Sequence, residues 1–418
     1  MQQRLSQHIL SRLIWVLSLI AIPCWIAADQ PVAWDFSVIQ QAMHSLRNGH
    51  DPYLDGIDLQ DAYLRSPAAL RGDPRPFVYV YSPITLLLLR PFASAPEALV
   101  RVSYWTLYIL LILAQLLIAR RLALPEEEYA ADLLTPIPLF FPGLLLFDSV
   151  LGGNIAFILF GLILLACWRG WTRQRWLAFY AAVLLASCFK TPYLTLLAIP
   201  LLSGRRQWIP ASVTAAAGIG LFAIQPYLWP VSFHNYLLAI DRIFSFNNDF
   251  GSGPAGRLGA SLAALHMSYV LPSVLFYLAT SLLVFFFLFR LSRHYHAGRL
   301  SREQWIPFMS LGVMLLNPRL IEYEIFPFTF FMAIIAYRLI AYSAWPRVAA
   351  TLLFPIWIGM NYFANRSRTG WKCCECAFLL VLFVGGYWQL QSSLRNLKQE
   401  KPRPMPQLSH LNHSPTSL

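Results

Sequence analysis

The segment 267–289, MSYVLPSVLFYLATSLLVFFFLF, decides the fold class, because it is uncharged and long enough to cross the hydrocarbon core of a bilayer as a helix. The segment 102–119, VSYWTLYILLILAQLLIA, has the same character. The composition of the whole chain agrees, since 57% of its 418 residues are hydrophobic and only 12% are charged. We therefore expect an all-α integral membrane protein.

Arginines stand in pairs and small groups at the ends of the apolar segments. Short loops rich in Lys and Arg favour the cytoplasmic face, so their alternation along the chain predicts about twelve spans with both chain ends in the cytoplasm. The expected spans lie near residues 8–28, 102–119, 132–150, 154–168, 176–189, 191–203, 208–229, 267–289, 304–317, 322–342, 346–363 and 375–390. The net charge of +12 is then a topology signal, and we expect the bilayer as a partner and no nucleic acid.

We expect one membrane domain over residues 1–390, with two long outer loops at 29–101 and 230–266. Within the first loop, residues 77–89 are too few to span and contain a proline, which favours an interfacial or re-entrant helix. The segment 391–418 has several prolines and cations and no apolar periodicity. It is predicted to be a disordered cytoplasmic tail.

Lys190 divides the apolar region 176–203. One interpretation is a single long span with a buried lysine, which would place Arg205 and Arg206 on the outer face. We prefer two short helices that meet at Lys190, because the arginines then remain cytoplasmic. An ionisable group at the ends of two spans is a functional candidate.

Asp35 is the strongest catalytic candidate. It follows the first span by a few residues and precedes a predicted helix over 37–47, which Asn48 and Gly49 close. At a helix start the carboxylate could simply serve as an N-cap. Its position after a span end, however, places it at the depth of a lipid phosphate, where a carboxylate can act on a lipid-linked substrate.

No motif for nucleotide binding or metalloprotease chemistry is present, so we expect no cofactor. Six cysteines do not form a disulfide framework. Cys373, Cys374 and Cys376 are expected in a short outer loop, but they lack the second ligand pair that a zinc site needs. We assign no metal.

Several short motifs, in this order, resemble the polyprenyl-phosphate-mannose-dependent mannosyltransferases of glycosyltransferase family 87. They are Asp35 soon after the first span, the turn Gly49-His50-Asp51-Pro52-Tyr53, the segment Tyr79-Val80-Tyr81-Ser82-Pro83, the triplet Gly152-Gly153-Asn154, the triplet Lys190-Thr191-Pro192, and the stretch from Asn317-Pro318-Arg319 through Tyr323. The last stretch departs from the family pattern, because members more often have a Trp and a His where this chain has Asn317 and Arg319 with Glu322 and Glu324.

The resemblance implies a C-superfamily membrane glycosyltransferase on the outer face of the cell (inner) membrane. The donor would be a polyprenyl-phosphate sugar and the acceptor a hydroxyl of a lipid-linked molecule or a glycan. The transferred hexose would be mannose, which comes from the family name alone. Asp35 would be the general base.

The candidate substrate-binding residues are Lys190, Arg257, Arg319, Asp51, Tyr53, Tyr81 and Asn154. The three cations would meet the donor phosphate, and the tyrosines could stack on a sugar or belong to an interfacial aromatic belt. Arg319 could instead pair with Glu322 or Glu324, and Asp51 could hold its turn through Pro52.

Two other enzyme or transport classes remain possible from the sequence. A lipid or solute transporter or flippase would also have many spans, although it should show related halves with polar residues at mid-span. A glycan polymerase or ligase of the outer face would be expected to have its large outer loop late in the chain. A scaffold without activity would leave Asp35 unexplained.

Overall fold

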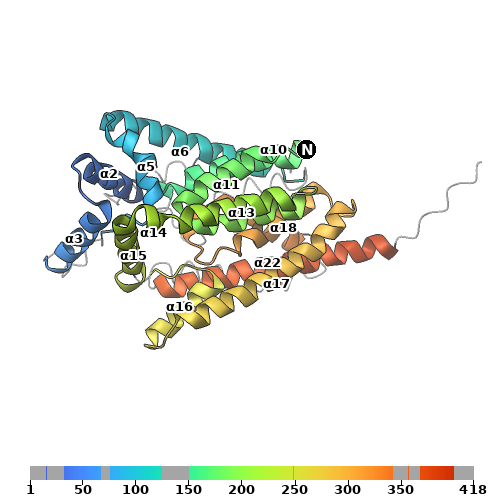
Figure 1. Ribbon diagram of the computed structural model, residues 1–418. Coiled ribbons are helices and arrows are strands. Elements are labelled where there is room, and N and C mark those ends of the chain that lie inside the picture. Colours follow the sequence, from blue (N-terminus) through green and yellow to red (C-terminus); the bar gives the residue numbers. More distant parts are fainter. Residues whose placement is uncertain are drawn as a thin grey trace, which may run out of the picture.

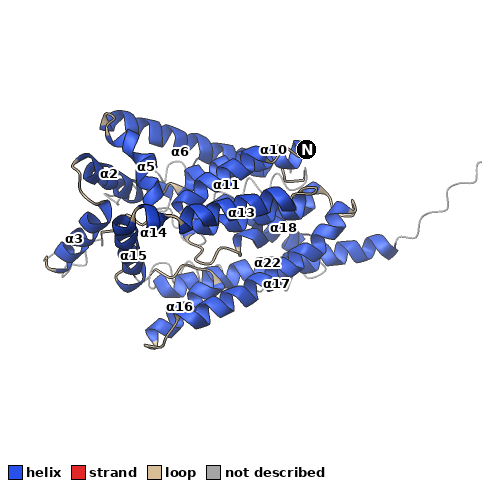
Figure 2. Cartoon of the chain, viewed as in Figure 1, coloured by secondary structure: helices blue, strands red, loops and turns tan. Residues whose placement is uncertain are grey.

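The computed structural model describes residues 33–66, 76–124, 150–247, 249–341 and 368–399, together with the single residues Val16 and Ile356. In these residues all regular structure is helical (Figure 2). In chain order the helices are α2 (Trp34–Arg47), α3 (Pro52–Leu64), α5 (Pro83–Ala93), α6 (Glu97–Arg120), α10 (Ala156–Arg173), α11 (Leu177–Phe189), η1 (Thr191–Leu197), α12 (Ala198–Ser203), α13 (Trp208–Ala223), α14 (Gln225–Leu228), α15 (Pro230–Ser245), α16 (Pro254–Ala264), α17 (Val270–His296), α18 (Arg302–Met314), α19 (Glu322–Ile325), η2 (Phe326–Phe328), α20 (Thr329–Ala341) and α22 (Arg368–Gln399).

Six helical segments within the described ranges are long and apolar enough to cross a membrane. They are Glu97–Arg120, Ala156–Arg173, Trp208–Leu228, Val270–His296, Glu322–Ala341 and Gly370–Asn396. The all-α membrane class is therefore confirmed. The count of about twelve spans is not confirmed. The expected spans 8–28, 132–150 and 346–363 lie almost wholly outside the described residues. The expected spans 176–189, 191–203 and 304–317 are shorter helices.

The long helices run side by side across the molecule, and several short helices gather at one end (Figure 1). α6 packs against α10, and α15 packs against α3 at that end. Buried aromatic residues of α18 and α20, such as Trp305 and Phe331, fill the centre and are 0% exposed. In contrast, Leu271 and Leu282 of α17 are 66% and 70% exposed, which suits a helix face turned toward lipid.

The chain breaks its helix at Lys190. α11 ends at Phe189, Lys190 is extended with φ −144° and ψ 112°, and a 3₁₀ helix begins at Thr191. Pro192 stands at the start of the new helix, where its missing N–H leaves no bond unmade. The predicted pair of short helices that meet at Lys190 is confirmed.

The last helix corrects two expectations. α22 runs to Gln399, so residues 391–399 are helical and do not belong to a disordered tail, while residues 400–418 lie outside the described residues. Residues 391–399 contain no Gly or Pro, and Leu394 is buried against the core, which supports a helix that the weak apolar periodicity did not reveal. The three cysteines expected in a loop lie on this helix as free thiols.

Candidate active site

Asp35 lies in the first turn of α2. The helix starts at Trp34, about three residues earlier than expected, after Ala33 in a left-handed conformation with φ 62°. The start of α2 has no side-chain cap, so Asp35 is not an N-cap. Its carboxylate is therefore not used to close its own helix.

A backbone turn from another part of the chain replaces the cap. The N–H groups of Asp35 and Phe36 both donate to the carbonyl oxygen of Gly152, at 3.0 and 3.1 Å, and Ala33 donates to Leu151 at 2.9 Å. The first N–H groups of a helix have no partner within the helix, and here the turn before α10 supplies one. This contact fixes the position of Asp35 relative to α10.

The turn itself requires glycine. Gly153 has φ +71°, and a Cβ there would lie 2.8 Å from the Trp105 ring. The next residue, Asn154, is 2% exposed, and its side-chain oxygen accepts from the N–H of Ala156 at 2.9 Å. Its side chain also forms a hydrogen bond with Asp35. The turn thus delivers a buried amide to the candidate base.

Burial raises the pKa of the Asp35 carboxyl from 3.8 to about 7. The hydrogen bond from Asn154 and the positive charge of Lys190 lower this pKa, while the negative charges of Asp249 and Glu322 raise it. Among the described residues, the Oδ2 atom is buried and has no hydrogen-bonding partner. A carboxyl with a pKa near neutrality and one unused oxygen can accept a proton.

Lys190 forms a buried ion pair with Glu324. Its Nζ lies 3.3 Å from Glu324 Oε1, and the two side chains are 14% and 5% exposed. The ammonium also lies 4.6 Å from the centre of the Tyr323 ring and 5.9 Å from that of Tyr81. The cation is thus held between two aromatic faces and a carboxylate, close to Asp35.

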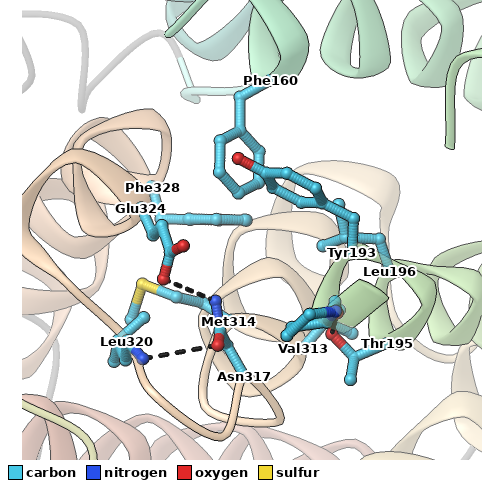
Figure 3. A pocket seen from close by; sticks show the side chains of 11 residues that line it. Phe160, Tyr193, Thr195, Leu196, Val313, Met314, Asn317, Leu320, Glu324 and Phe328 are labelled. Atoms are coloured by element: carbon cyan, nitrogen blue, oxygen red, sulfur yellow. Dashed lines mark hydrogen bonds between the residues drawn. The ribbon is translucent and has the colours of Figure 1, made fainter. Parts of the chain in front are cut away.

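Asn317 organises the stretch that departs from the family pattern (Figure 3). Its Nδ2 donates to Glu324 Oε2 at 2.7 Å, and its Oδ1 accepts from the N–H groups of Arg319 and Leu320 at 3.1 and 3.3 Å. Glu324 therefore receives Asn317 on one oxygen and Lys190 on the other. The asparagine fixes the carboxylate that holds the lysine.

Arg319 forms an ion pair with Asp249, which belongs to the second outer loop. The Arg319 Nη2 lies 3.0 Å from Asp249 Oδ2, and its Nε donates to the Asp249 carbonyl at 3.2 Å. The anticipated partners Glu322 and Glu324 are thus not its ion-pair partners. The Nζ of Lys372 in α22 lies 2.7 Å from Asp249 Oδ1 and 3.5 Å from Glu322 Oε1.

Asp249 and Lys372 were missed as site residues in the sequence. Asp249 stands in the polar, glycine-rich run of the second outer loop, and Lys372 is a cation beside the last apolar segment. An ionisable residue next to an apolar segment is a signal of function that would have identified Lys372, whereas the polar run around Asp249 gave no such signal. Their pairing was not visible, because it joins positions far apart in the chain.

Arg257 lies apart from the other two candidate cations. Its Nη2 donates to the carbonyl of Gly251, and its charge acts on Glu375 in α22. It is not among the charged groups that act on Asp35 or Lys190. The structure therefore brings Lys190 close to Asp35 and Arg319 close to Lys190, and it places Arg257 in a neighbouring polar cluster.

Asp51 and Tyr53 lie behind Tyr81. The Asp51 carboxylate caps α3 by accepting from the N–H of Tyr53 at 2.9 Å, and it also accepts from Asn235 Nδ2 of α15 at 2.9 Å. Tyr53 is 0% exposed, and its hydroxyl donates to the Tyr81 carbonyl at 2.6 Å. These contacts position the wall that carries Tyr81, whose ring faces Lys190.

An apolar groove of about 550 Å³ adjoins Arg319 and lies between α15, α16 and α17. Phe244, Phe250, Tyr269 and Val274 are among its lining residues. Arg319 lines the same groove and lies 5.9 Å from the Phe244 ring. A groove of this kind can hold an apolar chain whose charged end meets the guanidinium.

A buried carboxyl with a pKa near 7, a lysine whose charge acts on it and an apolar groove lined by an arginine occur together in this membrane protein. The sequence matches the profile of glycosyltransferase family 87 over residues 79–318, and the chain belongs to that family. It is a membrane glycosyltransferase. This selects the enzyme class over the transporter considered above.

The matched region includes Tyr81, Asn154, Lys190 and Arg257. Asp35, Asp51, Tyr53 and Arg319 lie outside it, so their assignment depends on the geometry. A search for relatives among curated proteins finds no match.

Proposed function

We propose that the enzyme transfers a hexose, with mannose as the first candidate, from a polyprenyl-phosphate donor to a hydroxyl of a lipid-linked or glycan acceptor. The observation that carries this proposal is the position of Asp35, a buried carboxyl with a pKa of about 7 beside Lys190. General-base catalysis is most efficient when the pKa of the base lies near the working pH.

In the proposed reaction the acceptor oxygen forms a bond to the anomeric carbon of the sugar. The bond from that carbon to the phosphate oxygen breaks, and the lipid monophosphate leaves with the bonding electrons. The proton of the acceptor hydroxyl passes to Asp35. Asn154 holds the carboxylate in place through its side-chain hydrogen bond.

Lys190 and Arg319 are the proposed phosphate ligands. Each is paired with a carboxylate, Glu324 at 3.3 Å and Asp249 at 3.0 Å, which keeps it oriented in a buried environment. Fixed cations stabilise the negative charge that develops on a leaving phosphate without any reorganisation. The guanidinium of Arg319 can bind two phosphate oxygens, and Lys190 one.

The groove beside Arg319 is the proposed site of the polyprenyl chain. Its aromatic and aliphatic lining suits isoprene units, and burial of each CH₂ group contributes about 0.8 kcal/mol. α17 forms one side of the groove and exposes leucines, so a lipid could enter from the bilayer. The groove and the two cations would thus bind the two ends of an amphipathic donor.

We further propose a C-type glycosyltransferase fold of about twelve spans in the cell (inner) membrane, with both termini in the cytoplasm. The outer face would then hold the end of the molecule where α2, α3 and α15 gather (Figure 1). These helices belong to the loops 29–101 and 230–266, which the arginine pattern assigns to the outside.

Transfer assays with the detergent-purified protein test the proposal. Polyprenyl-phosphate mannose, glucose and arabinose are offered together with a membrane-lipid extract as acceptor, and transfer from the mannose donor is expected. Transfer from a sugar nucleotide but from none of the three lipid donors would exclude the proposed donor class. Transfer from another of the lipid sugars would correct only the identity of the transferred sugar.

A further inference from the structure

A second polar cluster lies between α16, α22 and the start of α19. Its members are Glu375, Ser252, Arg257, Lys372 and Glu322. Glu375 and Ser252 are 0% exposed, and Lys372 and Glu322 are 3% and 5% exposed. The mechanism proposed above uses none of these side chains.

Several buried atoms of this cluster have no hydrogen-bonding partner among the described residues. They are both carboxylate oxygens of Glu375, the hydroxyl oxygen of Ser252 and the Nε of Arg257. Ser252 nevertheless lies close enough to Glu375 to act on its carboxyl as a hydrogen-bonding side chain. A buried polar atom without a partner loses its hydration and gains nothing in return. So many such atoms in one place indicate a site whose ligand supplies the missing hydrogen bonds.

The charges of the cluster restrict the chemistry of that ligand. Arg257, Lys372 and Glu322 are the charged groups that act on the Glu375 carboxylate. A cation would be attracted by the two carboxylates but repelled by the two basic groups. An anion would be attracted by the basic groups but repelled by the carboxylates. Hydroxyl groups fit both, because each can donate to a carboxylate and accept from the guanidinium or from Ser252.

Glu322 links this cluster to the catalytic carboxyl. Its charge acts on Asp35 and also on Glu375. Lys372 ties the same two regions together, since its Nζ lies 2.7 Å from Asp249 and 3.5 Å from Glu322. Glu322 thus lies within electrostatic reach of both Asp35 and Glu375, so a molecule with several adjacent hydroxyl groups is the kind of ligand that could contact both regions.

We propose that Glu375, Ser252 and Arg257 bind the hydroxyl groups of the acceptor, and that the acceptor is itself a sugar. This inference rests on the proposed transfer reaction, because it assigns the group that attacks the donor. Lys372 and Glu375 lie one turn apart on α22, so this helix presents both to the cluster. Ser252 is held in position by a backbone hydrogen bond, because its N–H donates to the Leu320 carbonyl at 2.7 Å.

Binding of short glycosides to the detergent-purified protein tests this site without any turnover. The probes are the hexyl glycosides of mannose, glucose, galactose and arabinose, with hexanol as the control for the chain, measured by calorimetry. At least one glycoside is expected to bind, and Glu375→Gln and Ser252→Ala should each weaken that binding about tenfold or more, the effect of a lost hydrogen bond to a charged group. The matched control Glu97→Gln, at an exposed position on α6, should bind as the wild type does.

Three results would overturn the proposal. They are binding of none of the glycosides, equal binding of hexanol, and unchanged affinity in both variants, which would mean that only water fills the cluster. Thermal unfolding verifies that each variant is folded, and Ser252→Ala serves if Glu375→Gln is not. Glycoside binding without any sugar transfer would refute the proposed function and leave this site standing, whereas transfer with acceptor KM unchanged in folded Glu375→Gln would refute the site alone.

Discussion

The backbone N–H of Asp35 donates to the carbonyl oxygen of Gly152 at 3.0 Å, and this bond joins the first outer loop to the start of α10. Because the Gly152 carbonyl satisfies the first turn of α2, the Asp35 side chain is not needed as a cap. The carboxylate is instead directed toward Asn154 and Lys190. Several expected outcomes depend on this arrangement.

Gly153→Ala should damage the site through its backbone. The residue has φ +71°, and the new Cβ would lie 2.8 Å from Trp105 and 3.2 Å from Phe36. We expect a loss of stability of about 1–3 kcal/mol and a loss of activity, because Asn154 moves with the turn. The control is Gly49→Ala, which has φ +75° but no atom within 4 Å. Equal melting temperatures and activities in the two variants would contradict the proposed contact.

Asp35→Asn should abolish transfer and preserve the fold. The amide is nearly the same size but cannot accept the proton, so kcat should fall by roughly 10²–10⁴. Asp58→Asn, at an exposed position on α3, is the matched control and should be fully active. Activity within threefold of wild type in Asp35→Asn would exclude this residue as the base.

The pH dependence follows from the raised pKa of Asp35. Only the ionised carboxylate is a base, so kcat/KM should rise about tenfold per pH unit below pH 7 and level off above it. Removal of the negative charge in Glu322→Gln should move the inflection to lower pH, because Glu322 raises this pKa. A rate profile that is flat between pH 5 and 9 would contradict the assignment.

The same shift has a consequence for stability. The folded state holds the Asp35 proton more tightly than the unfolded state, whose pKa is near 3.8. This contribution is present in full below pH 4 and is lost as the pH rises to about 7. As the pH rises from about 4 to about 7, the melting temperature of the wild type should therefore fall relative to that of Asp35→Asn.

The role of Lys190 can be separated from its ion pair with Glu324. Lys190→Met alone leaves Glu324 as an uncompensated buried charge and should destabilise the protein by about 3–5 kcal/mol. The double variant with Glu324→Gln should recover most of the melting temperature. If Lys190 binds phosphate, donor KM should stay raised by about tenfold or more in the double variant. Recovery of donor KM together with stability would show that the lysine serves only the pair.

The groove can be tested by filling it. Ser273→Phe places a ring among the lining residues between α16 and α17. It should raise KM roughly tenfold for a donor with a long polyprenyl chain, the cost of about two buried CH₂ groups. A donor with a two-isoprene chain should be used as well by the variant as by the wild type. An equal rise for both donors would place the chain elsewhere.

Local sequence features predicted those parts of the structure that depend on neighbouring residues alone. The break at Lys190 followed from a charge inside an apolar region next to a proline, and Asp35 was chosen as the candidate base from its expected place after a span end. The start of α2 was expected about three residues too late, because the Gly152 carbonyl, which is distant in sequence, serves as its cap. The end of the last helix was missed because few of its final residues are apolar.

The sequence by itself determined that this is a helical membrane protein and which charged residues stand at the ends of its helices. A spanning helix satisfies its own backbone and needs only a long apolar segment, so this information is local. Only the tertiary structure decided that Lys190 pairs with Glu324 and Arg319 with Asp249, and that Lys372 and Glu375 share a cluster with Arg257. Those partners are selected by the packing of helices that are distant in the chain, and burial makes their pairing necessary.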